Sequence, residues 1–275
     1  NPKKHIMINS FTFFIKIALL LLVFVSPVLS QKKIPKIKNV IVKSIEEKKE
    51  KLIEISDNIW EAAELSLREF KSSKYLSDYA EENGFKVEKG VAGIPTAFTA
   101  SYGSGRPIIG IMGEFDANAG ISQKKQPIKE PLVKGGAGHG CGHNLFGTAS
   151  LGAAIAIKEL IESGEISGTV IFYGTPAEET IFAKVWMVRE GLFDKLDLCM
   201  DWHPGSEIAA ATQSSKALVD FRLKFFGNAA HASGDPWNGN SAVDAMELYT
   251  TGLNYYREHI KPTARIHYDI EKAGD

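Results

Sequence analysis

The stretch "VKGGAGHGCGHNLFGTASLGAAIAI", residues 133–157, decides how the rest of this chain is interpreted. It sets His139, Cys141 and His143 within a run of glycines, and a helix of small residues is predicted over about 147–162. Glycine lets the backbone adopt unusual angles and approach a ligand closely. The loop therefore either cradles a ligand or turns a tight corner, and the flanking segments have to distinguish the two.

Short apolar segments alternate with helical segments on both sides of this loop. Strands are predicted at 107–112, within "GTVIFYGTPAEE" (168–179) and within "LDLCMDWHPG" (196–205), and the segment from Thr96 alternates like a hairpin. Helices are predicted within 44–83 (two), over 147–162 and through "IFAKVWMVREG" (181–191). This alternation indicates an α/β fold with a largely parallel sheet covered on both sides. Cys199 is expected to be a buried strand residue.

The pattern changes near residue 213, and we place a domain boundary there, between a first domain (31–212) and a second (213–275). In "ALVDFRLKFFG" (217–227), apolar and charged residues alternate as in a half-buried strand. A helix over about 241–259 and a further alternating run, "ARIHYDIE" (264–271), follow. These elements predict the start of a small α+β domain. Because the chain opens with Asn1 and stops at Asp275 after a strand-like run, we expect both ends to be incomplete.

Residues 7–30 have the layout of a secretory signal peptide. Met7 and Lys16 precede an unbroken apolar run, and Val28 and Ser30 are the small residues expected before a cleavage point. The alternative is an uncleaved membrane anchor. We favour cleavage, and therefore expect a secreted or periplasmic protein with no stable membrane anchor.

Charge and cysteine content argue against two further classes of protein, nucleic-acid-binding proteins and proteins stabilised by a disulfide framework. Three of the 32 basic residues but none of the 33 acidic residues precede residue 31, so the remaining chain has 29 basic and 33 acidic residues, a net charge of −4. No basic patch with interleaved aromatic residues occurs, so nucleic acid is not an expected partner. Two cysteines, Cys141 and Cys199, are too few for a disulfide framework.

Chemically active side chains follow each of the three predicted core strands. The first strand is followed by Glu114, Asp116 and the glycine loop, the second by Glu178 and Glu179, and the third by Asp201 and His203. The carboxyl ends of parallel strands meet at one edge of a sheet, where ligands bind. Thiolate, imidazole and carboxylate groups together are ligands for zinc or a similar ion, and a carboxylate-rich set favours a catalytic site with a position open to water. One glutamate of the adjacent pair can bind metal while the other moves protons.

Other classes of site remain open at this point. Cys141 could be a nucleophile with His139 or His143 as its base, although clustered carboxylates would raise the pKa of the thiol. The glycine spacing fits neither a dinucleotide fingerprint nor a Walker loop. A non-catalytic small-molecule binding protein also stays possible.

Several long motifs of the chain are similar to those of the M20 metallopeptidases and amidohydrolases, nearest to the B-subunit type of aminobenzoyl-glutamate hydrolase. The resemblance covers residue 45 to the end and rests on "GEFDANAGISQ", "GHGCGHNLFGTASLGAA", "GTPAEE", "AKVWMVREGLFD", "DWHPG" and "AAHASGDPWNGNSAVDAMEL". It implies a zinc-peptidase-like catalytic domain interrupted by a ferredoxin-like lid that mediates dimerisation. Two divalent ions, zinc or manganese, are implied as cofactors.

The resemblance also implies roles for particular residues. The metal ligands would be Cys141, His143, Glu179 and His203, whereas His139 would have a supporting role beside them. Glu178 matches the catalytic glutamate, and Asp116 matches an aspartate that orients a metal-bound histidine. His231 matches a lid histidine that reaches into the active site of a partner protomer.

The resemblance further implies cleavage of an amide bond in an N-acyl-amino acid, an aminobenzoyl-glutamate-like compound or a dipeptide. It implies a homodimer, or a heterodimer with a related chain. Two features depart from the family pattern. The rest of the lid, the last catalytic strands and a final metal histidine would lie beyond Asp275, and a signal peptide is unusual for the folate-breakdown enzymes of this type.

Overall fold

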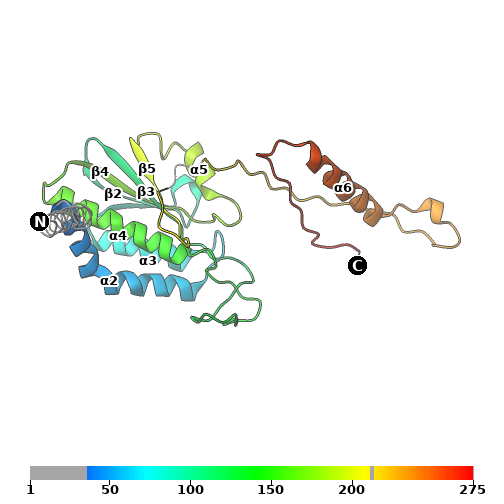
Figure 1. Cartoon of the computed structure of the whole chain (residues 1–275), viewed down its shortest axis with the longest axis horizontal. Coiled ribbons are helices and arrows are strands. Elements are labelled where there is room, and N and C mark those ends of the chain that lie inside the picture. The colour runs from blue at the N-terminus through cyan, green and yellow to red at the C-terminus, as the bar shows by residue number, and fades with distance from the viewer. Residues whose placement is uncertain (1–35, 211–213, 275) are drawn as a thin grey trace, which may run out of the picture. The chain divides into compact units, whose positions relative to one another are not determined.

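The computed structural model describes residues 36–210 and 214–274, and the chain divides into two compact units between Ser206 and Glu207 (Figure 1). The sequence predicts this boundary between 212 and 213. The predicted signal peptide lies outside the described residues.

The first unit is built on a five-stranded sheet in the order β1-β2-β4-β3-β5. Strands β4, β3 and β5 run parallel to one another, and β2 and β1 add an antiparallel edge beside β4. The strands are β1 (Lys86–Lys89), β2 (Phe98–Ser104), β3 (Ile108–Gly113), β4 (Gly168–Gly174) and β5 (Leu198–Met200). The predicted α/β class with a parallel central sheet is therefore confirmed.

The helix α4 (His143–Glu162) makes β3 and β4 parallel neighbours, since it returns the chain to the start of the sheet. The predicted hairpin before β3 is wrong in its pairing. Although only three residues separate β2 from β3, β4 lies between them. The burial of β4 fits this order. Val170 and Phe172 on one face are fully buried, Tyr173 on the other face is almost fully buried, and an interior position pairs both edges of the strand.

Three helices cover one side of the sheet, as Figure 1 shows: α2 (Lys36–Ala62), α3 (Phe70–Glu82) and α4. The predicted closure of the second helix at "ENGF" is confirmed, because the chain turns at Gly84 with a φ of 81°. The other face is covered only in part, so the prediction of cover on both sides is wrong for the described residues. There Tyr173 packs on Phe193, with ring centroids 4.6 Å apart, and α5 (Ala183–Arg189) is short.

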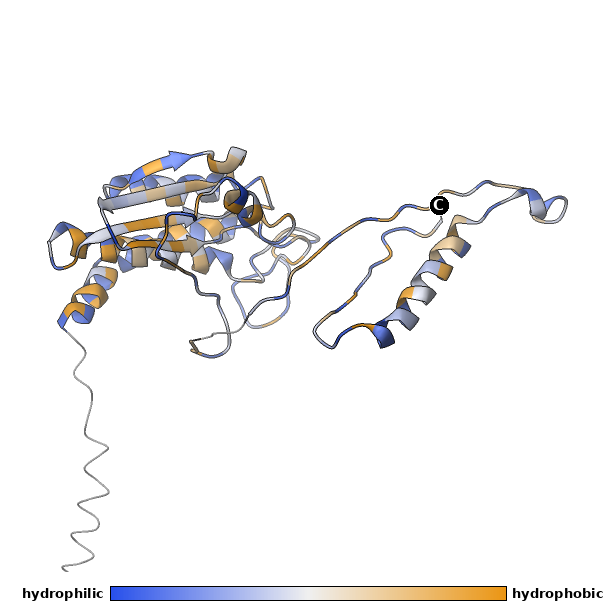
Figure 2. Ribbon diagram, turned by 90° about the horizontal axis from the view of Figure 1, so that it is seen from above, coloured by the Kyte–Doolittle hydropathy of each residue, from blue (hydrophilic) through white to orange (hydrophobic). Residues whose placement is uncertain are grey.

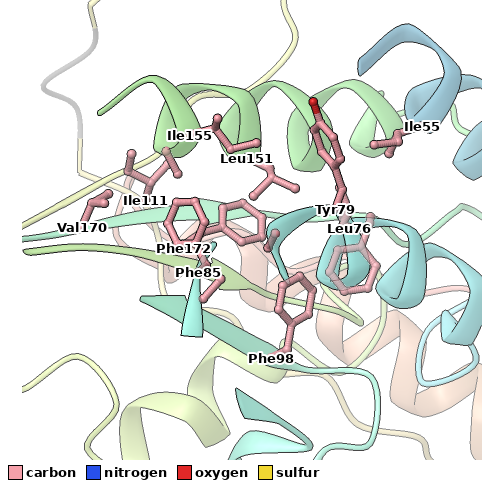
Figure 3. Close-up of a cluster of buried hydrophobic side chains, with 14 of the residues drawn as sticks. Ile55, Leu76, Tyr79, Phe85, Phe98, Ile111, Leu151, Ile155, Val170 and Phe172 are labelled. Carbon is pink, nitrogen blue, oxygen red and sulfur yellow. The ribbon is translucent and has the colours of Figure 1, made fainter. Parts of the chain in front are cut away.

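The core lies between the sheet and these helices. Leu151 and Ile155 of α4 face Ile111, Val170 and Phe172 of the strands, as Figure 3 shows. Among the described residues, α4 is the one helix long and apolar enough to cross a membrane, but 61% of its apolar window is buried in this core. Its apolar character is therefore that of a core helix.

Strand β5 does not behave as a buried strand. Cys199 is exposed, and its neighbours Leu198 and Met200 are about half exposed, at 50% and 48%. The predicted burial of Cys199 is wrong because β5 pairs with β3 on one side and has no further strand beyond it in the described part of the chain.

Among its described residues, the second unit contains one well-formed helix, α6 (Ala242–Tyr256), which lies within the predicted range and continues into a short 3-10 turn, Arg257–His259. Ser241 caps it by accepting a hydrogen bond from the backbone N–H of Asp244 at 3.0 Å. The predicted strands at 217–227 and 264–271 are not strands in this structure, since the described residues there form no ladder. An isolated bridge joins Asn228 to Asn240. Figure 2 shows hydrophobic and hydrophilic residues interleaved along these segments.

Candidate metal centre

The carboxyl ends of the parallel strands deliver the predicted side chains to one place. Two clusters have their ligand atoms within 4.8 Å of one another. One cluster consists of Cys141, His143 and His203, and the other of Glu114, His143 and Glu178. His143 is common to both. The two clusters combine side chains that follow β3, β4 and β5, as the strand-end argument predicts.

His143 is the first residue of α4 and is completely buried. The helix begins four residues earlier than predicted, after Gly142, whose φ of 78° is left-handed and suits glycine. Nδ1 of His143 lies 2.9 Å from Oδ1 of Asp116. On the other side of the ring, Nε2 faces carboxylate oxygens of Glu114 at 2.9 Å and of Glu179 at 3.8 Å, which are ion-pair distances for a protonated ring. Neither contact has the geometry of a hydrogen bond.

Electrostatics favour a positive charge at this position. Burial opposes charge on the imidazole, but Asp116 and Glu114 outweigh it and raise the pKa of His143 to about 10. A proton on Nε2 is one way to supply that charge, and a metal ion is another. The carboxylates around the ring are thus arranged for a cation.

Asp116 is buried and connects three parts of the site. Its Oδ2 accepts hydrogen bonds from the backbone N–H of Glu179 at 2.9 Å and from the hydroxyl of Ser66 at 3.2 Å, while Oδ1 faces His143. A carboxylate on Nδ1 fixes the ring orientation and leaves Nε2 free toward the cluster. This is the geometry that an orienting aspartate requires.

Cys141 and His203 face each other, with Sγ 3.2 Å from Nε2. The backbone N–H of Cys141 donates to Asn118 at 3.2 Å, and Nδ1 of His203 lies 2.9 Å from the carbonyl oxygen of Pro204. Burial, followed by the nearby charge of Glu179, raises the pKa of the Cys141 thiol to about 11. A thiolate therefore does not form here without a cation, which weighs against a free nucleophilic cysteine.

Glu178 follows β4 and is half-buried. Burial and the neighbouring Glu114 raise the pKa of its carboxyl group above the ordinary value. Glu114 itself is buried and pairs with Lys184 of α5. Burial opposes its charge, but His143 and Lys184 outweigh it and lower the pKa of Glu114.

The residues present fit divalent metal ions. A thiol, two imidazoles and several carboxylates form the donor set, which suits zinc or a related ion. Nε2 of His143 and Oε1 of Glu179 are both buried and without a hydrogen-bond partner among the described residues. Buried polar atoms are rarely left so, and a shared cation would satisfy both.

Two predicted histidines are members of neither cluster. Nε2 of His139 lies 3.0 Å from the carbonyl oxygen of Ile59 in α2, so the ring anchors the glycine loop to that helix. His231 belongs to the second unit, where its Nδ1 accepts backbone hydrogen bonds from Ser233 at 3.2 Å and Gly234 at 2.9 Å. Its role toward a partner protomer stays a prediction.

Two residues next to the clusters are not indicated by the sequence analysis. Lys184 belongs to a predicted helix, and only its closeness to "PAEE" along the chain could have placed it within reach of the strand ends. Glu69 is fully buried and contacts the residue before Glu178, and no pattern around it in the sequence signals this burial.

Comparison with known proteins agrees with this geometry. The model of peptidase family M20/M25/M40 matches residues 110–269. The B-subunit of p-aminobenzoyl-glutamate hydrolase from Escherichia coli (strain K12) is 44% identical over 234 residues, which are 84% of this chain and 48% of that protein. Xaa-Arg dipeptidase of Mus musculus is 32% identical over 242 residues, 84% of this chain and 52% of that protein.

The fold is also found in a solved structure. The crystal structure of an aminobenzoyl-glutamate utilization protein from Klebsiella pneumoniae superimposes with a TM-score of 0.55 at 17% identity, covering 78% of this chain and 60% of that one. At that identity the likeness concerns the fold alone.

A mixed α/β sheet with thiol, imidazole and carboxylate groups at the ends of its parallel strands is the architecture of a metallohydrolase domain. The chain belongs to peptidase family M20/M25/M40, because the match covers more than half of its 275 residues. It spans about half the length of the curated relatives it matches.

Proposed function

We propose that the protein is a metal-dependent amidohydrolase. Its substrate would be an N-acyl-amino acid, an aminobenzoyl-glutamate-like compound or a dipeptide. The observation that supports this best is the buried Nε2 of His143, which has no hydrogen-bond partner among the described residues and faces carboxylates beside a cysteine and a second histidine.

Cys141, His143, Glu179 and His203 would hold two divalent ions, zinc or manganese. When bound, such ions polarise a scissile carbonyl group and lower the pKa of water toward neutrality. Asp116 would keep the ring of His143 oriented through Nδ1. The raised pKa of Glu178 suits it to take a proton from the attacking water and return it to the leaving nitrogen.

The names of the relatives support the proposed class of substrate. One relative belongs to a p-aminobenzoyl-glutamate hydrolase and another is an Xaa-Arg dipeptidase, so both names describe an amide bond next to an amino acid. The other chain of the Escherichia coli hydrolase, its A-subunit, is also similar, at 28% identity over 65% of this chain. We therefore propose either a homodimer or a heterodimer with a related chain, in which His231 would approach the partner's site.

The signal peptide predicted at 7–30 supports a secreted or periplasmic location, as a proposal. Export would bring the enzyme to extracellular dipeptides or acyl-amino acids. N-terminal sequencing of the protein recovered from its native host would show whether Gln31 is the first residue.

The test uses the longest natural form of the chain, since the relatives are about twice as long. Metal content is measured by elemental analysis, and hydrolysis is followed on a panel of N-acyl-amino acids, dipeptides and aminobenzoyl-glutamate. We expect activity that chelation abolishes and that Zn²⁺ or Mn²⁺ restores. Activity that survives complete removal of metal would contradict the proposal and favour a thiol-dependent hydrolase. Tight binding of these compounds without turnover would favour a binding protein.

A further inference from the structure

Glu69 immediately precedes α3 and is completely buried, with no exposed surface. Its two carboxylate oxygens accept separate hydrogen bonds. Oε1 accepts the backbone N–H of Ala177 at 2.9 Å, and Oε2 accepts the hydroxyl of Thr96 at 3.1 Å. Glutamate is almost never fully buried unless it has specific partners, and here these partners are an amide and a hydroxyl group rather than a cation.

The residue that Glu69 contacts has an unusual backbone. Ala177 has a φ of 57°, in the left-handed region that residues with a Cβ atom seldom adopt, and it is fully buried. Such a conformation persists only where surrounding contacts impose it. The hydrogen bond from Ala177 to Glu69 is one such contact.

The same turn is held at its other end by a second carboxylate. The backbone N–H of Glu179 donates to Asp116 at 2.9 Å. Glu178 therefore lies between two backbone groups that are each fixed by a buried acidic side chain. The direction in which Glu178 and Glu179 leave the backbone depends on the conformation of residues 177–179.

We propose that Glu69 is a positioning residue, which holds the turn at Ala177 so that Glu178 and Glu179 point into the metal centre. This inference rests on the proposed function, and it adds a residue that touches neither metal nor substrate. A purely structural glutamate at this position would affect folding stability alone. A positioning glutamate affects the metal affinity and the turnover of a folded protein.

The experiment compares variants of the full-length protein. Glu69→Gln keeps an acceptor for Ala177 and a polar partner for Thr96, whereas Glu69→Leu has neither. Thr96→Val is the matched control, since it removes the other hydrogen bond and leaves the one to Ala177. The readouts are the dissociation constant for Zn²⁺ by chelator competition, kcat and KM separately, and amide exchange at residues 177–179.

We expect Glu69→Leu to weaken Zn²⁺ binding by about 10- to 100-fold, the usual effect of losing a group that orients a ligand. Its kcat should fall by more than its KM changes, and the amides of Ala177 and Glu179 should exchange faster. Glu69→Gln and Thr96→Val should stay close to wild type in all three readouts. Unchanged Zn²⁺ affinity and kcat in folded Glu69→Leu would overturn the proposal.

A second substitution separates positioning from general stability. Glycine adopts a positive φ without strain, so Ala177→Gly should restore part of the Zn²⁺ affinity lost in Glu69→Leu. If the double variant regains none, the proposal is wrong. If Glu69→Leu does not fold, amide exchange in the wild type tests the proposal instead. An Ala177 amide that exchanges as fast as exposed amides would overturn the proposal.

The two proposals fail in different ways. A wild-type protein that binds no divalent ion and hydrolyses no substrate on the panel contradicts the proposed function, whatever Glu69 does. An active metalloenzyme whose Zn²⁺ affinity and kcat do not change when Glu69 is replaced contradicts only this inference.

Discussion

The carboxylate of Asp116 lies 2.9 Å from Nδ1 of His143, and both side chains are fully buried. This contact occupies Nδ1 and leaves Nε2 facing Glu114 and Glu179. The same carboxylate accepts the backbone N–H of Glu179. One buried aspartate thereby orients two groups that we propose as metal ligands.

Replacing Asp116 should weaken metal binding. In Asp116→Asn one of the two oxygens becomes an NH2 group, so the hydrogen bonds to His143 and to the backbone of Glu179 cannot both be kept. We expect Zn²⁺ affinity to fall by about 10- to 100-fold. Ser66→Ala is the control, since it removes only the 3.2 Å hydrogen bond to Asp116 and should bind Zn²⁺ nearly as the wild type does. Isothermal titration of both variants measures the difference.

Glu178→Gln should separate proton transfer from metal binding. Glutamine keeps the size of the side chain but cannot accept and return a proton, so kcat should fall by about two orders of magnitude or more. Metal content, measured by elemental analysis, should not change. Glu190→Gln, at the exposed end of α5, is the control and should be fully active. A near-wild-type rate in Glu178→Gln would rule out the proposed role.

Cys141→Asp tests a ligand against a nucleophile. A carboxylate can replace a thiolate as a metal ligand, so some metal and activity should remain, whereas a lost nucleophile leaves none. Cys199→Ser is the matched control, because Cys199 is the other cysteine of the chain and is exposed on β5. Intact-mass spectrometry during turnover should find no acyl group on Cys141, and trapping one there would overturn the ligand assignment.

Much of the site could be predicted because its residues follow strands. The sequence places Asp116, Glu178 and His203 just after apolar segments, and parallel pairing brings those positions together. Glu69 could not be found in this way, since its importance comes from a backbone conformation at Ala177 that has no signature in the sequence. The early start of α4 escapes prediction because glycine and histidine have low helix propensity, while burial of His143 and Asn144 stabilises the first turn.

The second unit shows the limit of periodicity. Alternation in 217–227 predicts a strand correctly only where another strand completes the ladder, and the described residues of that unit provide none. The same limit applies to β5, whose apolar sequence predicts burial that depends on further elements. Periodicity therefore identifies which side chains share one face of a strand, but not whether another element covers that face.

The burial of Glu69 makes stability depend on pH. Burial raises the pKa of its carboxyl group to about 7 from an ordinary value of 4.5, and Asp116 contributes in the same direction. The folded protein therefore binds more protons than the unfolded chain between pH 4.5 and 7, and this group lowers the free energy of unfolding as pH rises through that window. Glu69→Gln should remove this trend, so that its stability relative to wild type increases from pH 4.5 to 7.

Urea denaturation at several pH values measures this effect. We expect the difference between Glu69→Gln and wild type to change by roughly 2 to 3 kcal/mol across the window, at about 1.4 kcal/mol for each pKa unit. Thr96→Val, which keeps the carboxyl group, should follow the wild-type pH profile. A difference that is constant with pH would show that Glu69 titrates normally.

Gly147 allows α4 to lie against the end of β3. A Cβ atom there would be 2.5 Å from the carbonyl oxygen of Glu114. The backbone of Glu114 cannot move aside without displacing its side chain, which belongs to the metal centre. We expect Gly147→Ala to destabilise the protein by about 1–3 kcal/mol and to weaken Zn²⁺ binding. Gly152→Ala is the control on the same helix, because its nearest neighbours are side-chain ends of Leu52 and Ile45, which can adjust. Thermal unfolding and Zn²⁺ titration of both variants test this.

The position of β3 between β4 and β5 also sets an order of events during folding. Both neighbours follow β3 in the chain, and each metal-ligand cluster takes members from the ends of two different strands. A chain emerging from the ribosome therefore completes one cluster only after Glu178, and the other only after His203, has been synthesised and the parallel strands have paired. Parallel pairing over such sequence distances is slow, because the closing of long loops precedes the contacts that reward it. We expect the cation to bind at the end of folding, so that the rate of metal uptake would report the rate at which the sheet is completed.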